Sequence, residues 1–152
     1  MECSITLSRF RGAAWLLAGL ALALPARAAD ALVLVVPARS PIQSLDSLQV
    51  RKAFVGLSVT VNGGTIVPLI NNSQESLRAA FLQHVVGLSE QMYRRRTLTL
   101  ALQQGRAAPA VHTQQAELLR ELDANAYSVT YMWQSSAVGL DQLRVVRVLW
   151  RD

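Results

Sequence analysis

A polar turn between a predicted strand and a predicted helix holds the residues best suited to bind an anion. Residues 65–70 form an apolar run typical of a short buried strand, and residues 73–86 place apolar side chains at helical spacing. The turn between them carries Asn72, Ser73 and Ser76. Backbone N–H groups at the start of a helix lack intrahelical acceptors and coincide with the positive end of the helix dipole. The pattern therefore predicts a site for a small anion.

Arginine side chains near this turn would supply positive charge to such an anion. Arg78 follows the turn in the same predicted helix, and Arg39 lies in a loop over residues 38–41. The guanidinium fork of arginine matches an oxyanion with two parallel hydrogen bonds. We take as candidate ligand-binding residues Ser40, Asn72, Ser73, Ser76, Arg78 and Thr130.

A helix cap is the competing interpretation of the same turn. Asn72 suits the N-cap position, and Glu75 three residues later would accept from its backbone N–H in a capping box. That arrangement uses donors that an anion would need, and the spacing of Glu75 favours it. At the level of sequence both interpretations stay open.

Catalytic chemistry has little support in the sequence. There is no Gly-x-Ser-x-Gly nucleophile elbow, and no carboxylate pair has a setting that suits general acid–base work. The two histidines, His84 and His112, have no second ligand at metal-binding spacing. We therefore predict that the chain is not an enzyme and that it uses neither a metal nor a cofactor.

The first 28 residues have the pattern of a signal peptide. Arg9 and Arg11 precede an apolar run over residues 13–24, and residues 26–28 form a small-x-small cleavage site. The run is too short to span a bilayer comfortably. We predict cleavage after Ala28, export to the periplasm and no stable membrane span afterwards.

The predicted mature chain, residues 29–152, contains no thiol, because the only cysteine is Cys3. Disulfides, cysteine metal sites and cysteine nucleophiles are therefore excluded. Removal of the signal takes away three basic residues and one acidic residue, which leaves 12 and 9 and a net charge of +3. So mild an excess in an exported chain argues against nucleic acid as a partner. The length suits one domain with one core.

Strands alternate with helices along the mature chain. Residues 31–36 suit a strand buried on both faces, and Asp46 with Gln49 predicts a capped helix that ends near Gly56. Pro68 argues for an edge or end position of its strand. We further predict a tight turn at 62–64, a helix from Ser89 to about 102 and a loop at 104–112. A helix capped by Thr113 should follow and end at Asn125 in the left-handed conformation. Strands are predicted at 127–133 and 143–150. The alternation predicts a three-layer α/β domain with a small, mostly parallel or mixed sheet.

Four segments of the mature chain carry a resemblance to one family. Residues 46–56 resemble a leucine-arginine-arginine-isoleucine-phenylalanine-x-glycine helix, and residues 63–70 resemble the turn and strand after it. Residues 72–81 resemble a serine-rich, phosphate-holding turn and helix, and residues 125–131 are similar to a glycine-alanine-isoleucine-glycine-tyrosine strand. These are motifs of phosphate-type (type 2) periplasmic solute-binding proteins, and the match resembles their small single-lobe members. The resemblance implies one lobe of that fold and a phosphate-like ligand.

Two departures from the family pattern bear on the ligand. Aligned on Phe81, the family's serine-glycine-threonine is replaced by Glu75, Ser76 and Leu77, and a carboxylate there would repel phosphate. Thr130 replaces a glycine and narrows the room beside the turn.

Two functions follow from this reading. One is an exported, non-catalytic solute-binding-like domain that holds phosphate or a similar oxyanion, with a partner or dimer supplying the second wall. The alternative is a ligand-free protein-interaction or sensor domain of the cell envelope. The run Arg94-Arg95-Arg96 fits a solvated helix face, or a docking surface for an acidic partner or anionic lipid.

Overall fold

The structure is a computed structural model that describes residues 30–151. The predicted signal peptide, its cleavage site after Ala28 and Cys3 lie outside the described residues. Within residues 30–151, no helix has the length and apolar character needed to cross a bilayer.

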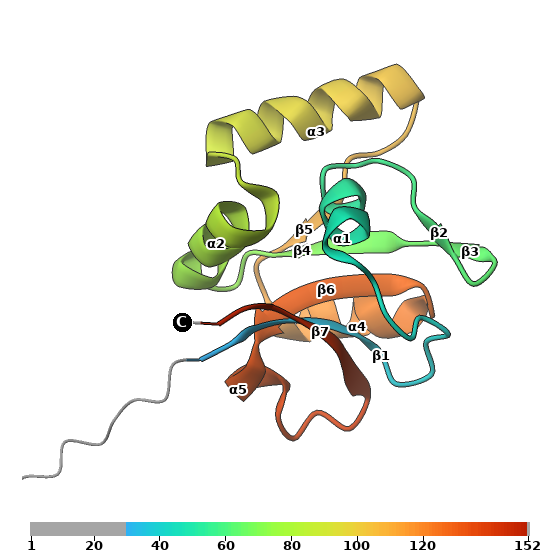
Figure 1. The fold of residues 1–152 in the computed structure, drawn as a ribbon, viewed down its shortest axis with the longest axis vertical. Helices are drawn as coiled ribbons and strands as arrows, with labels where there is room; N and C mark the ends of the chain where they lie inside the picture. The colour runs from blue at the N-terminus through green and yellow to red at the C-terminus, as the bar shows by residue number, and fades with distance from the viewer. Residues whose placement is uncertain (1–29, 152) are drawn as a thin grey trace, which may run out of the picture.

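Five strands form one mixed sheet in the order β5-β4-β6-β1-β7 (Figure 1). The interior strand β1 is buried at every residue, as the apolar run predicted, and pairs antiparallel with both β6 and β7. Strand β4 pairs parallel with β6 on one side and β5 on the other. The strands are β1 (Leu32–Pro37), β4 (Val67–Asn71), β5 (Ala110–His112), β6 (Ser128–Trp133) and β7 (Leu143–Trp150).

Helices cover both faces of the sheet, which confirms the predicted three-layer α/β fold. Alternate residues of β1 enter two cores, with Leu32 and Leu34 in one and Val33 and Val35 in the other. The first core is covered by α1 (Ser47–Phe54), α2 (Glu75–Phe81) and a π-helical turn, η1 (Leu82–Val86), and the second by α4 (Gln115–Ala124). A short helix, α5 (Gln134–Ala137), precedes β7.

The long helix α3 (Glu90–Gln104) runs along the top of the molecule in Figure 1, beyond α1 and α2. Of its residues only Tyr93 and Thr97 are buried. The predicted start is confirmed, because Ser89 is the N-cap and its Oγ accepts from the Met92 N–H at 3.3 Å. A helix with so little buried surface depends on a few specific contacts to stay in place.

Local sequence signals fix several other element ends as predicted. The Asp46 carboxylate accepts from the Gln49 N–H at 2.7 Å, and the Gln49 side-chain oxygen accepts from the Asp46 N–H at 2.9 Å. This is the predicted capping box of α1. Gly87 ends η1 with φ of +69°, a conformation that L side chains rarely adopt.

Three predictions of detail are wrong. Helix α4 has Gln114, not Thr113, as its N-cap, and Asn125 ends it in an extended conformation with φ of −135°. Residues 110–112, within the predicted loop, form β5, which is too short and too exposed to show strand periodicity.

Pro68 lies in an interior strand, but at its second residue, where pairing with β5 has not yet begun. The missing N–H is tolerated there, which agrees with the end position and not the edge.

A Gly64→Ala change is expected to destabilise the hairpin of β2 (Thr60–Val61) and β3 (Gly64–Thr65) by about 1–2 kcal/mol. The Tyr127 ring lies on Gly64, so that an added Cβ would come 2.1 Å from Tyr127 Cζ. Moving the ring would break the 2.9 Å hydrogen bond from the Tyr127 hydroxyl to the Asn62 carbonyl. Urea unfolding measures the loss. In a Tyr127→Ala background the same change should cost much less, and an equal cost would contradict the packing explanation.

Candidate functional site

Asn71, the last residue of β4, organises the predicted anion-binding turn. Its side chain is buried, and its Nδ2 donates to the Tyr131 carbonyl at 3.0 Å. Its Oδ1 accepts from the Ser73 N–H at 3.1 Å and from the Ser73 hydroxyl at 2.7 Å. This side-chain turn takes up both Ser73 donors and holds residues 71–73 out of the helix.

The predicted cap of α2 is wrong for this reason. Gln74, and not Asn72, is the N-cap, and it makes no side-chain cap hydrogen bond. The Asn72 N–H donates instead to the His112 carbonyl at 2.8 Å, which ties the turn to the end of β5. Glu75 is the first helical residue and lies exposed in the first turn. No capping box therefore competes for the donors of this turn.

Some donors at the start of α2 stay open. The first intrahelical hydrogen bond joins the Arg78 N–H to the Gln74 carbonyl at 3.1 Å, so the N–H groups of residues 75–77 precede the helical ladder. Ser76 is exposed beside them. The carboxylate of Glu75 lies in the same turn and would repel an incoming anion.

Arg78 is bound by partners inside the fold. Its Nε and Nη2 donate to the two carboxylate oxygens of Glu90 at 3.0 and 3.1 Å, and its Nη1 donates to the Tyr131 hydroxyl at 3.3 Å. Its guanidinium carbon lies 4.8 Å from the centroid of the Tyr93 ring, within cation–π range. Arg78 thus joins α2, the start of α3 and β6. Its predicted part in ligand binding stays a proposal.

The electrostatics of this cluster are dominated by burial and by the ion pair. Burial opposes the charge of Arg78, but the hydrogen bonds to Glu90 and Tyr131 outweigh it and raise the pKa of the guanidinium. The hydrogen bond from Arg78 lowers the pKa of Glu90. Burial raises the pKa of Tyr131 to about 12 and also raises the pKa of Tyr93. Both tyrosine hydroxyls therefore stay neutral at physiological pH, where that of Tyr93 donates to the Phe54 carbonyl and that of Tyr131 accepts from Arg78.

The predicted grouping of Arg39 and Ser40 with the turn is wrong. Strand β1 runs antiparallel to β6, and β6 runs parallel to β4, so the loop after β1 lies at the opposite end of the sheet from Asn71. There Arg39 donates to the Asp123 carbonyl and lies 3.7 Å from the Asp123 carboxylate. Ser40 is buried, and its Oγ accepts from the Ile42 N–H at 3.3 Å.

Thr130 is fully buried between strands. Its Oγ1 donates to the Leu69 carbonyl at 2.8 Å, so the hydroxyl is satisfied within the sheet. The structure therefore brings Asn72, Ser73 and Ser76 together at one turn. Arg78 and Thr130 are buried, and their side chains bond to other parts of the fold.

The two histidines have different surroundings in the described part of the chain. His84 stacks on Trp150 with ring centroids 4.3 Å apart and planes 11° from parallel. The Nε2 atom of His112 is buried and has no hydrogen-bond partner among the described residues. Residues 30–151 contain no group of three His, Cys, Asp or Glu side chains placed to hold a metal ion.

Sequence reasoning does not find Asn71, Glu90 or Tyr131 as participants. Asn71 follows the apolar strand run, and Glu90 lies 12 residues after Arg78. One signal was available, because Arg78 precedes Phe81 by three residues and so shares its inward face. Nothing in the sequence ties Arg78 to Glu90 or Tyr131.

Comparison with known proteins supports the fold assignment. No protein-family model matches the sequence, and no curated protein matches it. Among solved structures, an ABC-type phosphate transport receptor from Vibrio cholerae is 15% identical with a TM-score of 0.56, and the match covers 79% of this chain and 46% of the receptor. A Clostridium perfringens protein described as a phosphate ABC transporter substrate-binding protein with bound phosphate is 17% identical, with a TM-score of 0.57 and coverage of 80% and 46%. PstS from Borrelia burgdorferi is 12% identical, with a TM-score of 0.56 and coverage of 80% and 48%.

These likenesses define the class of fold. The chain has the fold of one lobe of a phosphate-type periplasmic binding protein, which confirms the resemblance stated from its motifs. It spans about half the length of the proteins that it matches. At these identities the match establishes the fold of a solute-binding-like domain, and the ligand is a separate question.

Proposed function

We propose that this chain is an exported, non-catalytic, solute-binding-like lobe that works through a partner protein of the cell envelope rather than as a phosphate receptor on its own. The state of Arg78 carries this proposal, because three of its guanidinium atoms donate to Glu90 and Tyr131 and leave no open fork for an oxyanion. The pattern of residues 1–28 supports export to the periplasm.

Weak oxyanion binding is the second candidate function. The uncapped first turn of α2 favours it, because the N–H groups of residues 75–77 and the Ser76 hydroxyl remain available. The turn also follows the carboxyl end of β4, beside two parallel neighbours, where open α/β sheets commonly bind ligands.

Calorimetric titration of the mature chain with phosphate and with sulfate separates the two functions. We expect no saturable binding below millimolar concentration, both for the native chain and for Glu75→Ser. Glu117→Ser is the matched control, because Glu117 occupies the first turn of α4 on the other face of the sheet. We also expect the tagged chain, purified from its native envelope, to retain one partner at near-stoichiometric amount.

Micromolar phosphate binding that Ser76→Ala abolishes would overturn the partner proposal. Binding that appears only in Glu75→Ser, and not in Glu117→Ser, would identify the turn as an impaired oxyanion site. Release of a fused reporter into the periplasm, with the mature chain beginning after Ala28, tests the export prediction separately.

A further inference from the structure

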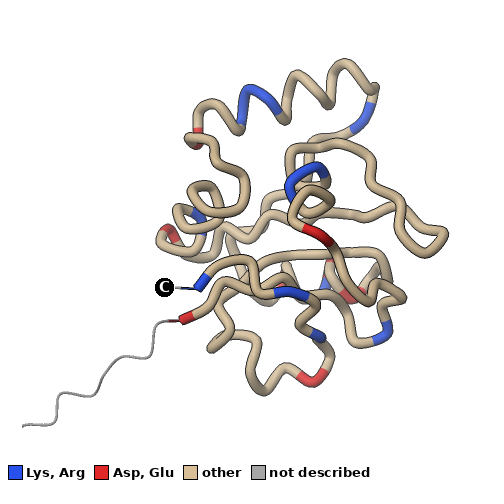
Figure 2. Tube along the Cα trace, in the orientation of Figure 1, with Lys and Arg blue, Asp and Glu red and all other residues tan. Residues whose placement is uncertain are grey.

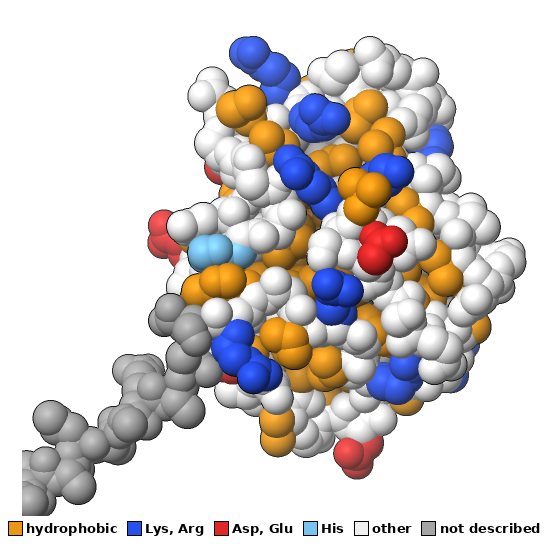
Figure 3. Space-filling view, in the orientation of Figure 1, with side chains coloured by type: hydrophobic (Ala, Val, Ile, Leu, Met, Phe, Trp, Pro, Cys, Tyr) orange, Lys and Arg blue, Asp and Glu red, His pale blue; other side chains and the backbone are white. Residues whose placement is uncertain are grey.

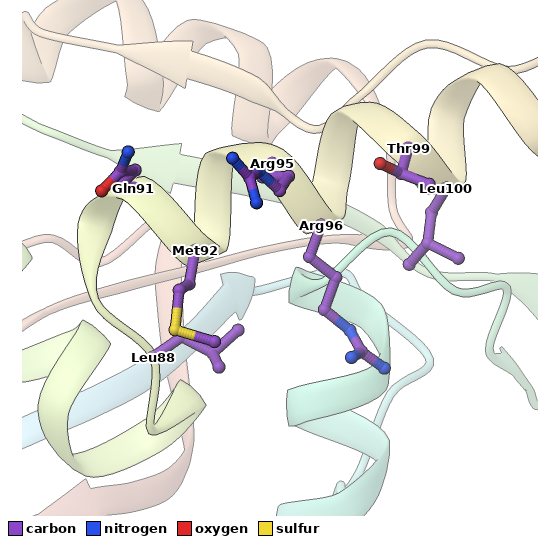
Figure 4. Close-up of a pocket in the computed structure, with 7 residues that line it drawn as sticks. All are labelled: Leu88, Gln91, Met92, Arg95, Arg96, Thr99 and Leu100. Carbon is purple, nitrogen blue, oxygen red and sulfur yellow. The ribbon is translucent and has the colours of Figure 1, made fainter.

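A groove between α1 and α3 combines an apolar floor with a basic rim (Figure 4). One hollow of about 540 Å³ is lined on α3 by Met92 and Leu100, with Arg95 and Arg96 beside them. Figure 4 shows Leu88 and Met92 pointing into the gap and Arg96 extending from α3 toward the neighbouring helix. An adjoining hollow of about 260 Å³ shares Leu88 and Arg96 and is lined otherwise by Leu48, Arg51, Lys52, Val55 and Leu57.

Helical spacing explains why these side chains share one groove. Met92, Arg96 and Leu100 follow one another every fourth residue and form one ridge of α3. On α1, the outward residues Leu48 and Lys52 have the same spacing. Leu48 and Met92 are 59% and 60% exposed, so large apolar side chains from both walls remain in water. A concave apolar strip of this kind marks an interaction surface more often than an isolated exposed leucine does.

The charge of the groove has one sign. Arg51, Lys52, Arg95 and Arg96 line its two hollows, and no carboxylate does. None of the four has a salt-bridge partner within residues 30–151, whereas Arg94 of the same run lies 3.7 Å from Glu90. Figure 2 shows the basic segments on α1 and α3, and Figure 3 shows basic side chains around apolar surface in that region. Unpaired cations in a shallow concave site attract an anionic partner over a longer range than contact.

We propose that this groove binds an acidic amphipathic helix of the partner protein, an inference that rests on the proposed function. Apolar residues on one face of such a helix would enter the floor between Leu48 and Met92, and its flanking carboxylates would pair with the four cations. From Gln91 to Leu100 the groove follows roughly 14 Å of α3, which accommodates about two and a half helical turns.

The occupant is a different protein and not a second copy of this chain. Among the described helices, α4 carries the acidic residues Glu117 and Glu121, but its apolar residues Leu118 and Leu122 are buried in the core. No described helix therefore offers an acidic flank together with a free apolar face of its own. Charge complementarity with a separate acidic helix fits the groove better.

Fluorescence anisotropy with synthetic peptides tests the inference. The probe is a labelled peptide of roughly 16 residues with leucine on one helical face and glutamate on both flanks. Two comparison peptides replace all its glutamates by lysine or all its leucines by serine. We expect the native mature chain to bind only the acidic amphipathic peptide, and added salt to weaken that binding.

Matched variants locate the binding. Arg96→Glu should weaken it by roughly tenfold or more, because Arg96 belongs to both hollows. Arg120→Glu, the same charge change on an exposed residue of α4, should leave it within about twofold. Met92→Gln should weaken it more than Leu102→Gln, since both lie on α3 but only Met92 lines the groove. Thermal melts confirm that each variant is folded.

Several outcomes would overturn the inference. These are equal binding of the three peptides, equal effects of Arg96→Glu and Arg120→Glu, dimerisation through the groove, or binding to phosphatidylglycerol vesicles with no peptide binding. The proposed function is judged separately. A partner that co-purifies when the peptides fail would reject the groove but keep the function, and micromolar phosphate binding would reject the function whatever the peptides do.

Discussion

Replacement of Glu90 by alanine is expected to destabilise the fold by about 2–3 kcal/mol, more than removal of its partner Arg78. The side chain of Arg78 is 11% exposed and that of Glu90 is 46% exposed. Without Glu90, a charged guanidinium stays buried against Tyr93 and Tyr131 with only one hydrogen-bond partner left. Without Arg78, the remaining carboxylate can be hydrated. The order of the two effects follows from this difference in exposure.

Urea unfolding at neutral pH of Glu90→Ala and Arg78→Met measures both effects. Methionine keeps most of the packing volume of the arginine stem, so the comparison isolates the charge. Glu117→Ala is the control, because Glu117 also lies in the first turn of a helix and shares the favourable dipole effect. A loss in Glu90→Ala no larger than in Glu117→Ala would contradict the role assigned to the ion pair.

The same pair predicts how stability depends on pH. The hydrogen bond from Arg78 lowers the pKa of Glu90 in the folded state. The unfolded chain therefore binds a proton more readily, and the contribution of Glu90 is present above its unfolded pKa of about 4.3 and lost as the pH falls through the lower folded value. Native protein should lose stability below about pH 4 more steeply than Glu90→Gln, which has no carboxylate to protonate.

The ion pair also positions α3 and with it the basic groove. Beyond this pair, α3 is held mainly by Tyr93, whose hydroxyl donates to the Phe54 carbonyl at 2.5 Å, and by the buried Thr97. Glu90→Ala should therefore speed amide exchange along α3 more than along β1, and it should weaken peptide binding although Glu90 does not line either hollow. The ion pair of Arg78 with Glu90 therefore also holds the α3 wall of the groove in place.

Much of the fold could be predicted from sequence because its signals are local. The apolar run of β1 encodes a strand buried on both faces, and Asp46 with Gln49 encodes a helix start through contacts three residues apart. The last strand, Leu143–Trp150, has the predicted bounds. These features need no knowledge of what lies across the sheet.

The candidate site could be predicted only in part because its chemistry depends on distant partners. Asn71 holds Ser73 in a side-chain turn by bonding to Tyr131 across the sheet, and this contact moves the start of α2 past the predicted cap. Ser40 lies at the opposite end of the sheet from the turn because β1 runs antiparallel to β6, and no local sequence pattern encodes the direction of that pairing. From sequence alone Arg78 is predicted to be a free cation, because nothing in the sequence pairs it with Glu90.

Phe81→Ala is expected to cost about 3–5 kcal/mol, the largest effect predicted for this chain. Phe81 is fully buried, and its ring stacks on Tyr131 with centroids 3.8 Å apart and planes 3° from parallel. Its ring also meets Phe54 edge to face at 5.0 Å. Truncation removes the aromatic contacts and leaves a cavity between α1, α2 and the sheet that rigid neighbours fill poorly.

Phe81→Leu separates the cavity from the aromatic contacts, and it should cost clearly less than Phe81→Ala because most of the volume is kept. Urea unfolding compares the two, and equal losses would contradict the cavity explanation. Because Phe81 anchors α2 from below, Phe81→Ala should also disturb the Arg78 contact with Tyr131 at 3.3 Å. Burial raises the pKa of Tyr131 to about 12 and the Arg78 hydrogen bond lowers it, so greater exposure of the hydroxyl and loss of that contact would shift this pKa in opposite directions. The aromatic stack is thus the support on which both the candidate turn and the arginine cluster depend.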